Sequence, residues 1–182
     1  MKPLILSHAG KTPRIAPDAY IAPGAILIGD VEIGPEASIW FGCILRADTN
    51  FIRVGARTNI QDGTVIHVNG TPENLPPDTP GWGVSIGADV TVGHMVLIHA
   101  CTLEDRSFVG MRASVIDGAV VESGAMVAAG ALVTPNKRVK KGELWAGSPA
   151  RPMRALTDKD YAEFEEVVHH YVERARRFMA GG

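Results

Sequence analysis

Branched or large apolar residues recur at every sixth position along most of the chain. A helix cannot keep a six-residue period on one face, because six residues overshoot a whole number of 3.6-residue turns. Short strands separated by bends suit the period, so we expect each of these anchors to point into a core. The anchors are Ile15, Ile21, Leu27, Ile33, Ile39, Leu45 and Phe51; Val54, Ile60 and Ile66; Ile86, Val92 and Ile98; and Val109, Val115, Val121, Val127, Val133, Val139 and Trp145.

Small or β-branched residues follow many anchors four positions later, often with glycine or proline in between. Glycine and proline at this density exclude long helices. Apolar residues make up 46% of the 182 residues but aromatic residues only 6%, so small aliphatic side chains must fill the core. The pattern predicts a β-dominated domain over residues 1–154 with a loop excursion at 69–83, where the period is lost and turn-forming residues accumulate.

The last part of the chain, residues 155–182, breaks the period and predicts an α-helix. Thr157 and Asp160 have the spacing of an N-terminal capping box, with aspartate in place of the usual glutamate. The apolar residues follow one helix face, and they are Tyr161, Phe164, Val167, Val168, Tyr171, Val172, Ala175 and Phe178. This helix is expected to cover an apolar surface of the strand domain or a subunit boundary.

Charge and composition exclude several partners. The formal net charge is −2, which gives no reason to expect nucleic acid or an anionic membrane as partner. No apolar run is long enough to span a bilayer, and the first residues do not have the pattern of a signal peptide. Cys43 and Cys101 are expected to be reduced thiols in the core, which favours a cytoplasmic location.

The repeat resembles that of the hexapeptide-repeat family, over roughly residues 11–150. Chains of this family coil into a left-handed, three-sided parallel β-helix. The resemblance implies three hexads per coil, so that 18 residues bring the chain back to the same column. Neighbouring coils then lie about 4.8 Å apart, the usual spacing of paired strands.

Coil spacing brings two histidines together. His67 and His99 each follow an anchor, and the anchors Ile66 and Ile98 are 32 residues apart. One coil accounts for 18 residues, and the excursion at 69–83 accounts for the rest. Arg46 follows Leu45, which lies one coil and a three-residue slip before Ile66. We therefore expect Arg46, His67 and His99 to form one column.

His94 does not fit that column. It lies five residues before His99, and extended chain of that length spans up to roughly 16 Å. Bonds of about 2.0–2.1 Å from zinc to imidazole nitrogen leave little slack. One chain is therefore not expected to bring all three rings to one ion. A neighbouring chain could supply His94, and closed symmetry of a three-sided prism favours a homotrimer.

The composite motif resembles that of the γ-class carbonic anhydrases. The matching residues are Arg46-Ala47-Asp48, Asn59-Ile60-Gln61-Asp62, His67, Gly93-His94 and Ile98-His99. The resemblance implies a homotrimer with three interfacial metal sites, in which His67 and His99 come from one subunit and His94 from the next. It also implies reversible hydration of CO2 to bicarbonate by a metal-bound hydroxide. Zn²⁺ is the first choice of metal, and Fe²⁺ or Co²⁺ would accept the same ligands.

The same resemblance implies roles for polar neighbours of the histidines. Gln61 would orient the hydroxide, and Asn59 would polarise the substrate. Arg46, with Asp48 and Asp62, would form an ionic network across the interface and help to place the product anion.

Tyr171 corresponds to a tyrosine of the family's final helix that is directed at the active site. The ionic residues could instead be a salt-bridge network alone, Gln61 and Asn59 could cap bends, and helical spacing is also typical of a core tyrosine.

Thr49 departs from the best-studied branch of the family, which has glutamate at this position. That branch also has a shuttling glutamate in the loop after the first metal histidine, where this chain offers Glu73 and Asp78 without a clear alignment. We therefore expect a complete metal site, and a missing proton shuttle would lower the hydratase activity. The alternatives are a metal-dependent acyl-CoA thioesterase, a hexapeptide acyltransferase that uses acetyl-CoA, and a non-catalytic assembly protein.

Overall fold

The structure is a computed structural model that describes residues 2–70 and 82–181. The centre of the expected excursion therefore lies outside the described residues, and its two ends are joined by a hydrogen bond from Asn69 N to Trp82 O of 3.0 Å. One helix, α1, spans Asp158–Met179. The strands are β1 (Leu4–Leu6), β2 (Arg14–Ile15), β3 (Tyr20–Ile21), β4 (Ile26–Ile33), β5 (Ser38–Ile39), β6 (Ile44–Val54), β7 (Asn59–Ile60), β8 (Val65–His67), β9 (Val84–Ile86), β10 (Thr91–Val92), β11 (Leu97–His99), β12 (Thr102–Leu103), β13 (Phe108–Val109), β14 (Ser114–Ile116), β15 (Val120–Val121), β16 (Met126–Val127), β17 (Leu132–Val133), β18 (Arg138–Val139), β19 (Glu143–Gly147) and β20 (Ala150–Ala155).

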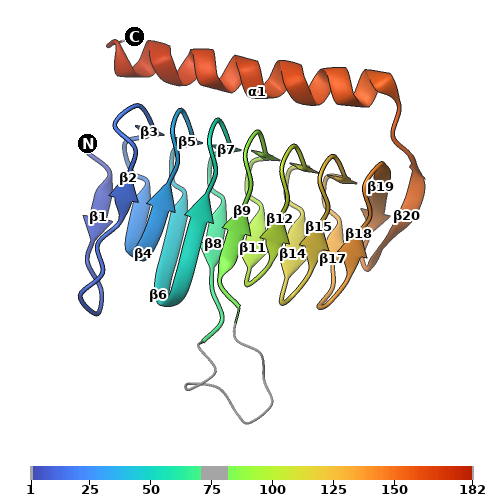
Figure 1. Ribbon diagram of the computed structural model, residues 1–182, viewed down its shortest axis with the longest axis horizontal. Helices are drawn as coiled ribbons and strands as arrows, with labels where there is room; N and C mark the ends of the chain where they lie inside the picture. Colours follow the sequence, from blue (N-terminus) through green and yellow to red (C-terminus); the bar gives the residue numbers. More distant parts are fainter. Residues whose placement is uncertain (1, 71–81, 182) are drawn as a thin grey trace.

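The strands stack as the coils of a β-helix, and Figure 1 shows them side by side along the long axis. One face pairs β3, β5, β7, β10, β13, β16 and β19 in parallel, and β20 closes it antiparallel to β19. The long strands β4 and β6 each run through a corner and belong to the other two faces. The face of β1, β8, β11, β14, β17 and the first halves of β4 and β6 is called the histidine face below. The expected β-helix of hexapeptide repeats is confirmed.

The core consists of small aliphatic side chains, as the composition predicted. Ile15, Ile21 and Trp145 are only partly buried because they lie near the ends of the stack, where fewer coils cover them. Phe51 was wrong as an anchor: Ile52 is fully buried instead and pairs with both Val31 and Val84. The pairing of β4 with β6 shifts register between Gly29 and Val31, so the inward-facing position moves by one residue at this corner.

Glycine is required where β4 meets β6. Gly29 has φ +78°, and a Cβ atom at this position would lie 2.1 Å from the carbonyl oxygen of Ala47. No side chain fits at that distance, and the left-handed backbone also favours glycine. This close approach holds the segment Arg46–Asp48 of β6 against β4, next to the histidines described below.

Helix α1 lies along the face formed by β3, β5, β7 and β10, and its C-terminal end reaches the N-terminal coils (Figure 1). The expected capping box is present, since Thr157 and Asp160 bond reciprocally to each other's backbone N–H groups. A hydrogen bond from Arg154 also lowers the pKa of Asp160. Between residues 2 and 181, outside the undescribed segment 71–81, no helix has the length and apolar character to cross a bilayer.

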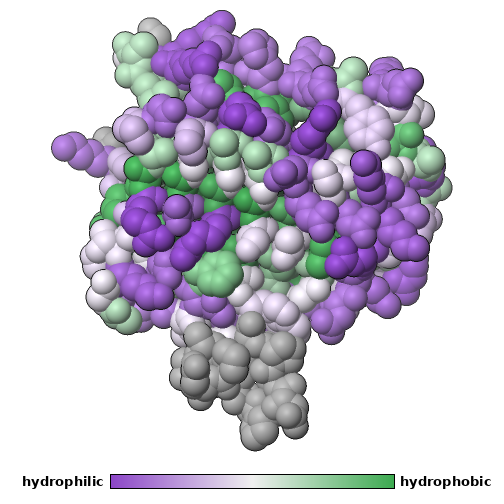
Figure 2. All heavy atoms as spheres, viewed as in Figure 1, coloured by the Kyte–Doolittle hydropathy of each residue, from purple (hydrophilic) through white to green (hydrophobic). Residues whose placement is uncertain are grey.

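An aromatic cluster fixes the end of α1 to the coils. Tyr171 and Phe178 of α1 pack on Trp40 with ring centroids 5.3 and 5.6 Å away, and Tyr20 packs beside them. In Figure 2 a band of apolar side chains crosses the β-helix below the helix, and more polar side chains lie on both sides of it. The expectation that α1 covers an apolar surface is confirmed.

Candidate metal centre

Arg46, His67 and His99 form the predicted column on the histidine face. Arg46 of β6 pairs with His67 of β8, and His67 pairs with His99 of β11. The two imidazole centroids are 5.2 Å apart, with the ring planes 46° apart. The calculation that removed the excursion from the coil spacing is therefore confirmed. Two neighbouring rings at this distance can converge on one ion.

Each of the three histidines has its own carboxylate. His67 Nε2 lies 3.0 Å from Asp48 Oδ1, His94 Nδ1 lies 2.9 Å from Asp62 Oδ2, and His99 Nδ1 lies 2.5 Å from Asp117 Oδ1. A carboxylate that accepts a ring N–H fixes the tautomer and the orientation of a metal-ligating histidine. The three pairs therefore have the donor arrangement that is typical of histidine-rich metal sites.

Asp117 was missed by the sequence analysis, although a signal was present. It lies 18 residues after His99, which is one coil, and its N–H donates to the His99 carbonyl at 2.9 Å. Asp62 was expected to join Arg46 and Asp48 in one network. Within this chain Asp62 pairs with His94, and the network across an interface stays a prediction.

The pairing decides which ring nitrogen keeps a lone pair. A carboxylate can only accept, so the paired nitrogen carries the proton. The lone pair then lies on Nε2 in His99 and on Nδ1 in His67, whose contacts with Asp117 and Asp48 are hydrogen bonds. Burial lowers the pKa of His67; the hydrogen bond to Asp48 opposes this effect, and the Arg46 charge adds to it. The neutral imidazole favoured in this way is the form that binds metals.

Asp48 links the histidine column to Arg46. Its carboxylate accepts hydrogen bonds from both Arg46 Nη1 and His67 Nε2. Burial acts to raise the pKa of Asp48, but these two hydrogen bonds outweigh it and leave the pKa below its usual value. The side chain therefore remains an anion between two donors.

Gln61 and Asn59 form a second polar pair, on and next to β7. Gln61 Nε2 donates to Asn59 Oδ1 at 3.0 Å, and Asn59 Nδ2 donates to Thr91 Oγ1 of the next coil at 2.9 Å. Asn59 is fully buried and Gln61 nearly so. Asn59 thus fixes the orientation of the Gln61 carboxamide, and Thr91 is a partner that the sequence analysis did not include.

Tyr171 lies in the aromatic cluster beneath α1. Its ring meets Trp40 edge to face, and burial raises the pKa of its hydroxyl; Arg174 opposes the shift and Asp62 adds to it.

The three histidines do not meet within one chain. Across residues 2–70 and 82–181, no three histidine, cysteine, aspartate or glutamate side chains are grouped so that they could hold a metal ion. The structure brings together His67 and His99 and leaves His94 in its own pair with Asp62. Two imidazoles alone make an incomplete site for zinc, which takes three or four protein ligands.

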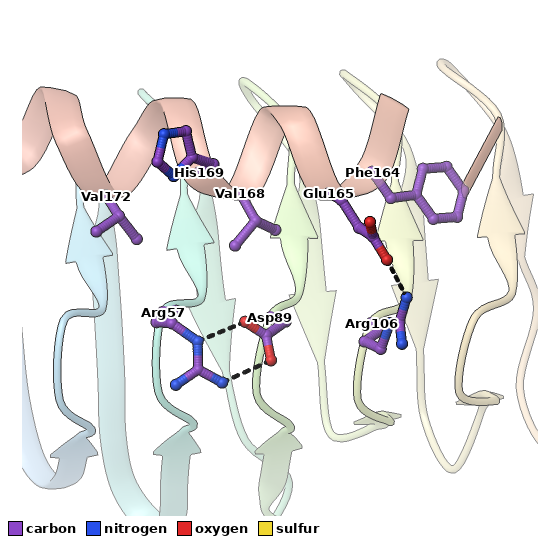
Figure 3. Close-up of a pocket in the computed structure, with 8 residues that line it drawn as sticks. All are labelled: Arg57, Asp89, Arg106, Phe164, Glu165, Val168, His169 and Val172. Carbon is purple, nitrogen blue, oxygen red and sulfur yellow. Dashed lines mark hydrogen bonds and ion pairs between the residues drawn. The ribbon is translucent and has the colours of Figure 1, made fainter. Parts of the chain in front are cut away.

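A pocket of about 320 Å³ lies elsewhere, between α1 and the corners of the coils (Figure 3). Its charged side chains are already paired. Arg57 makes two hydrogen bonds of 2.7 Å to Asp89, and Arg106 lies 2.5 Å from Glu165 of α1. These ion pairs connect neighbouring coils to each other and to α1, so the charged side chains of the pocket serve the packing of the helix on the coils.

No protein-family model matches the chain. Among curated proteins, carbonic anhydrase of Geobacillus kaustophilus is 37% identical over 177 residues, with 97% of this chain and 92% of the relative covered. Gamma carbonic anhydrase 2, mitochondrial, of Arabidopsis thaliana is 48% identical over 169 residues and 91% of this chain. The chain spans only 58% of the length of that plant relative. Protein YrdA of Escherichia coli is 38% identical over 170 residues, with 93% of this chain and 91% of the relative covered.

Solved structures share the fold over nearly the whole chain. A hexapeptide transferase family protein from Anaplasma phagocytophilum is 42% identical with a TM-score of 0.87, covering 96% of this chain and 98% of that one. A Bacillus cereus protein is 33% identical with a TM-score of 0.89 and covers 99% of both chains. With the paired histidines and these curated relatives together, the chain belongs to the family of γ-class carbonic anhydrases.

Proposed function

We propose that the protein is a metal-dependent carbonic anhydrase that interconverts CO2 and bicarbonate at sites shared between the subunits of a homotrimer. The observation that carries the proposal is the histidine geometry. Three imidazoles each have an orienting carboxylate, yet only His67 and His99 lie together in one chain. His94 of a neighbouring subunit would complete the ligand set.

The ligand chemistry fits a divalent transition metal. Three neutral imidazoles add no charge and leave an open coordination position, and we propose Zn²⁺, with Fe²⁺ and Co²⁺ as alternatives. Such an ion would act as a Lewis acid and would lower the pKa of bound water to about 7. The carboxylates of Asp48, Asp62 and Asp117 hold the rings in place for it.

The polar residues of the motif would have separate tasks. The Gln61 carboxamide would orient the attacking water molecule without adding charge, and Asn59 would hold Gln61 from its buried position. Arg46 would attract the bicarbonate anion, because its guanidinium is positively charged and its side chain is 46% exposed. The ion pair with Asp48 would hold the guanidinium in position. Tyr171 would face the site from α1, where its ring packs on Trp40.

An apolar stripe on the histidine face supports the trimer. Leu4, Ile44, Val65 and Leu97 are exposed and stack in register through Ile26, one position before the core anchors. The histidine column lies two positions further along the same strands. Contiguous exposed apolar side chains are typical of subunit interfaces. An interface over this stripe would place the histidine column between two chains.

The competing functions have weaker support. Hexapeptide transferases share the fold, but the curated relatives include several proteins named carbonic anhydrases, and a metal-free acyltransferase needs no set of three carboxylate-paired histidines. A metal-dependent acyl-CoA thioesterase and an assembly protein would keep the metal site. Both predict no CO2 hydration, so the assay below separates them from the proposal.

The proposed location is the cytoplasm. Cys43 and Cys101 are both buried free thiols, as the sequence predicted. Burial raises the pKa of Cys43 to about 12, and it also raises that of Cys101. Protonated thiols are unreactive, which suits a reducing compartment.

Gln61→Ala is expected to keep the metal and lose turnover. Elemental analysis should find about one metal ion per chain in the wild type and in the variant. Stopped-flow hydration of CO2 should be catalysed by the wild type and fall by on the order of 100-fold in the variant, because an orienting hydrogen bond at the reacting atoms is removed. Thr91→Val, which only loosens Asn59, should show a smaller loss. Full activity of Gln61→Ala would remove its assigned role, and metal without any hydration in the wild type would refute the proposed function.

Asp117→Ala is expected to weaken metal binding by roughly 10- to 100-fold, because His99 loses the carboxylate that fixes its ring. Competition with a chelator measures the affinity directly. Asp158→Ala, at the exposed start of α1, removes the same charge far from the histidines and should leave the affinity unchanged. Equal affinities for Asp117→Ala and the wild type would show that Asp117 does not support the site.

A further inference from the structure

A tight turn near the N-terminus places His8 beside the histidine face. Strand β1 pairs with β4 from Leu4 to Leu6, and the chain then reverses through Ala9 and Gly10, both with positive φ. His8 and Lys11 close the turn with two backbone hydrogen bonds of 2.9 Å. Lys11 Nζ lies 2.6 Å from Asp30 Oδ2, and Asp30 is buried. The position of His8 is therefore fixed by the backbone and by a salt bridge.

A cavity of about 220 Å³ separates this turn from β6. Its lining includes His8 and Lys11 on one side and Asp48 and Thr49 on the other. Asp48 also bonds to His67, a proposed metal ligand. At about 30 Å³ for each water molecule, the cavity has room for several. His8 and Asp48, the carboxylate that bonds to His67, thus line the same cavity.

The other charged groups of the cavity are unsuited to store a proton. Burial acts to raise the pKa values of Asp30 and Asp48, but hydrogen bonds from Lys11 and Arg53 to Asp30, and from His67 and Arg46 to Asp48, leave both values lowered. Both carboxylates therefore stay ionised near pH 7. Lys11 is a cation held by Asp30.

His8 differs from these groups. Its side chain is exposed and has no ion pair within the described part of the chain. Histidine is the residue type that ordinarily gains and loses a proton between pH 5 and 8.

Building on the proposed function, we propose that His8 relays the product proton from the active site to solvent. Hydration converts CO2 and H2O into HCO3⁻ and H⁺, so one proton must leave in each turnover. Water in the cavity passes this proton to a ring nitrogen of His8, where an N–H bond forms and the ring becomes an imidazolium. A buffer base in solvent then removes the proton and restores the neutral ring. No electron transfer is involved.

Oxygen-18 exchange between CO2 and water tests this relay, because it measures two rates separately. His8→Ala should leave the interconversion of CO2 and bicarbonate unchanged and lower the release of labelled water by roughly 10- to 100-fold in weak buffer. Added imidazole should restore the release. His169→Ala, an exposed histidine on α1, is the matched control and should change neither rate. His8→Gln, which keeps a polar side chain, should behave as His8→Ala.

Wild-type release of labelled water in His8→Ala, with interconversion intact, would overturn the relay alone. Absence of catalysed exchange in the metal-loaded wild type would overturn the proposed function and the relay with it. A second measurement needs no activity: the ring resonances of His8 in ¹⁵N-histidine-labelled, metal-free protein should move in Asp48→Asn and stay in place in Asp62→Asn. Unmoved resonances in Asp48→Asn would contradict the shared cavity.

Discussion

Mixed trimers of His67→Ala and His94→Ala subunits are expected to bind one metal ion each, although neither variant alone binds any. A site needs His67 and His99 from one subunit and His94 from the next. In a cyclic ring of three that contains both variants, one interface out of three combines the two intact halves, which gives about one third of the wild-type metal content. Co-expression with two different affinity tags isolates mixed trimers, and elemental analysis counts the metal.

A mixture of His67→Ala with His99→Ala subunits is the matched control. Both ligands come from the same side of the interface, so no combination of these subunits restores a complete set. This mixture is expected to stay free of metal. Equal metal contents in the two mixtures, or none in the first after mixing has been verified, would contradict a site shared between chains.

Leu97→Asp is expected to dissociate the protein into monomers that fold but hold no metal. Leu97 lies in the exposed apolar stripe, in register with Val65, and two residues before His99. An interface over the stripe would bury the new carboxylate without a partner, at a cost of roughly 3–5 kcal/mol. Sedimentation velocity measures the dissociation, and elemental analysis should show metal content falling from about one ion per chain to near zero.

Met153→Asp is the control for this variant. Met153 lies on β20 outside the stripe, and its exposed fraction of 68% is the highest among the large apolar residues of the described ranges. The charge should leave both assembly and metal content unchanged. A trimeric, metal-loaded Leu97→Asp protein would show that the stripe is not the subunit interface.

The alternation of anchors and bends was sufficient to predict the coils, because a six-residue period fits neither a helix nor a flat strand. The same period, with the excursion removed, placed Arg46, His67 and His99 in one column, and the strand register agrees. The capping box of α1 was equally local, since its partners are three residues apart. Features that depend on spacing along one chain were thus accessible from the sequence.

Other features were decided by how the coils meet. Phe51 and Ile52 are both apolar, and only the register shift beside Gly29 turns Ile52 inward. The pairing of Asp62 with His94, the burial of Asn59 and the cavity between His8 and Asp48 join residues from different coils.

The sequence by itself determined the period, and through it the fold and the alignment of two imidazoles, because strand pairing converts a fixed repeat directly into a fixed column. Tertiary structure decided which carboxylate holds each imidazole and which polar side chains are hidden from solvent. These properties depend on side-chain directions at corners and on distances of 2.5 to 3.0 Å across coils, which a repeat of backbone positions does not specify.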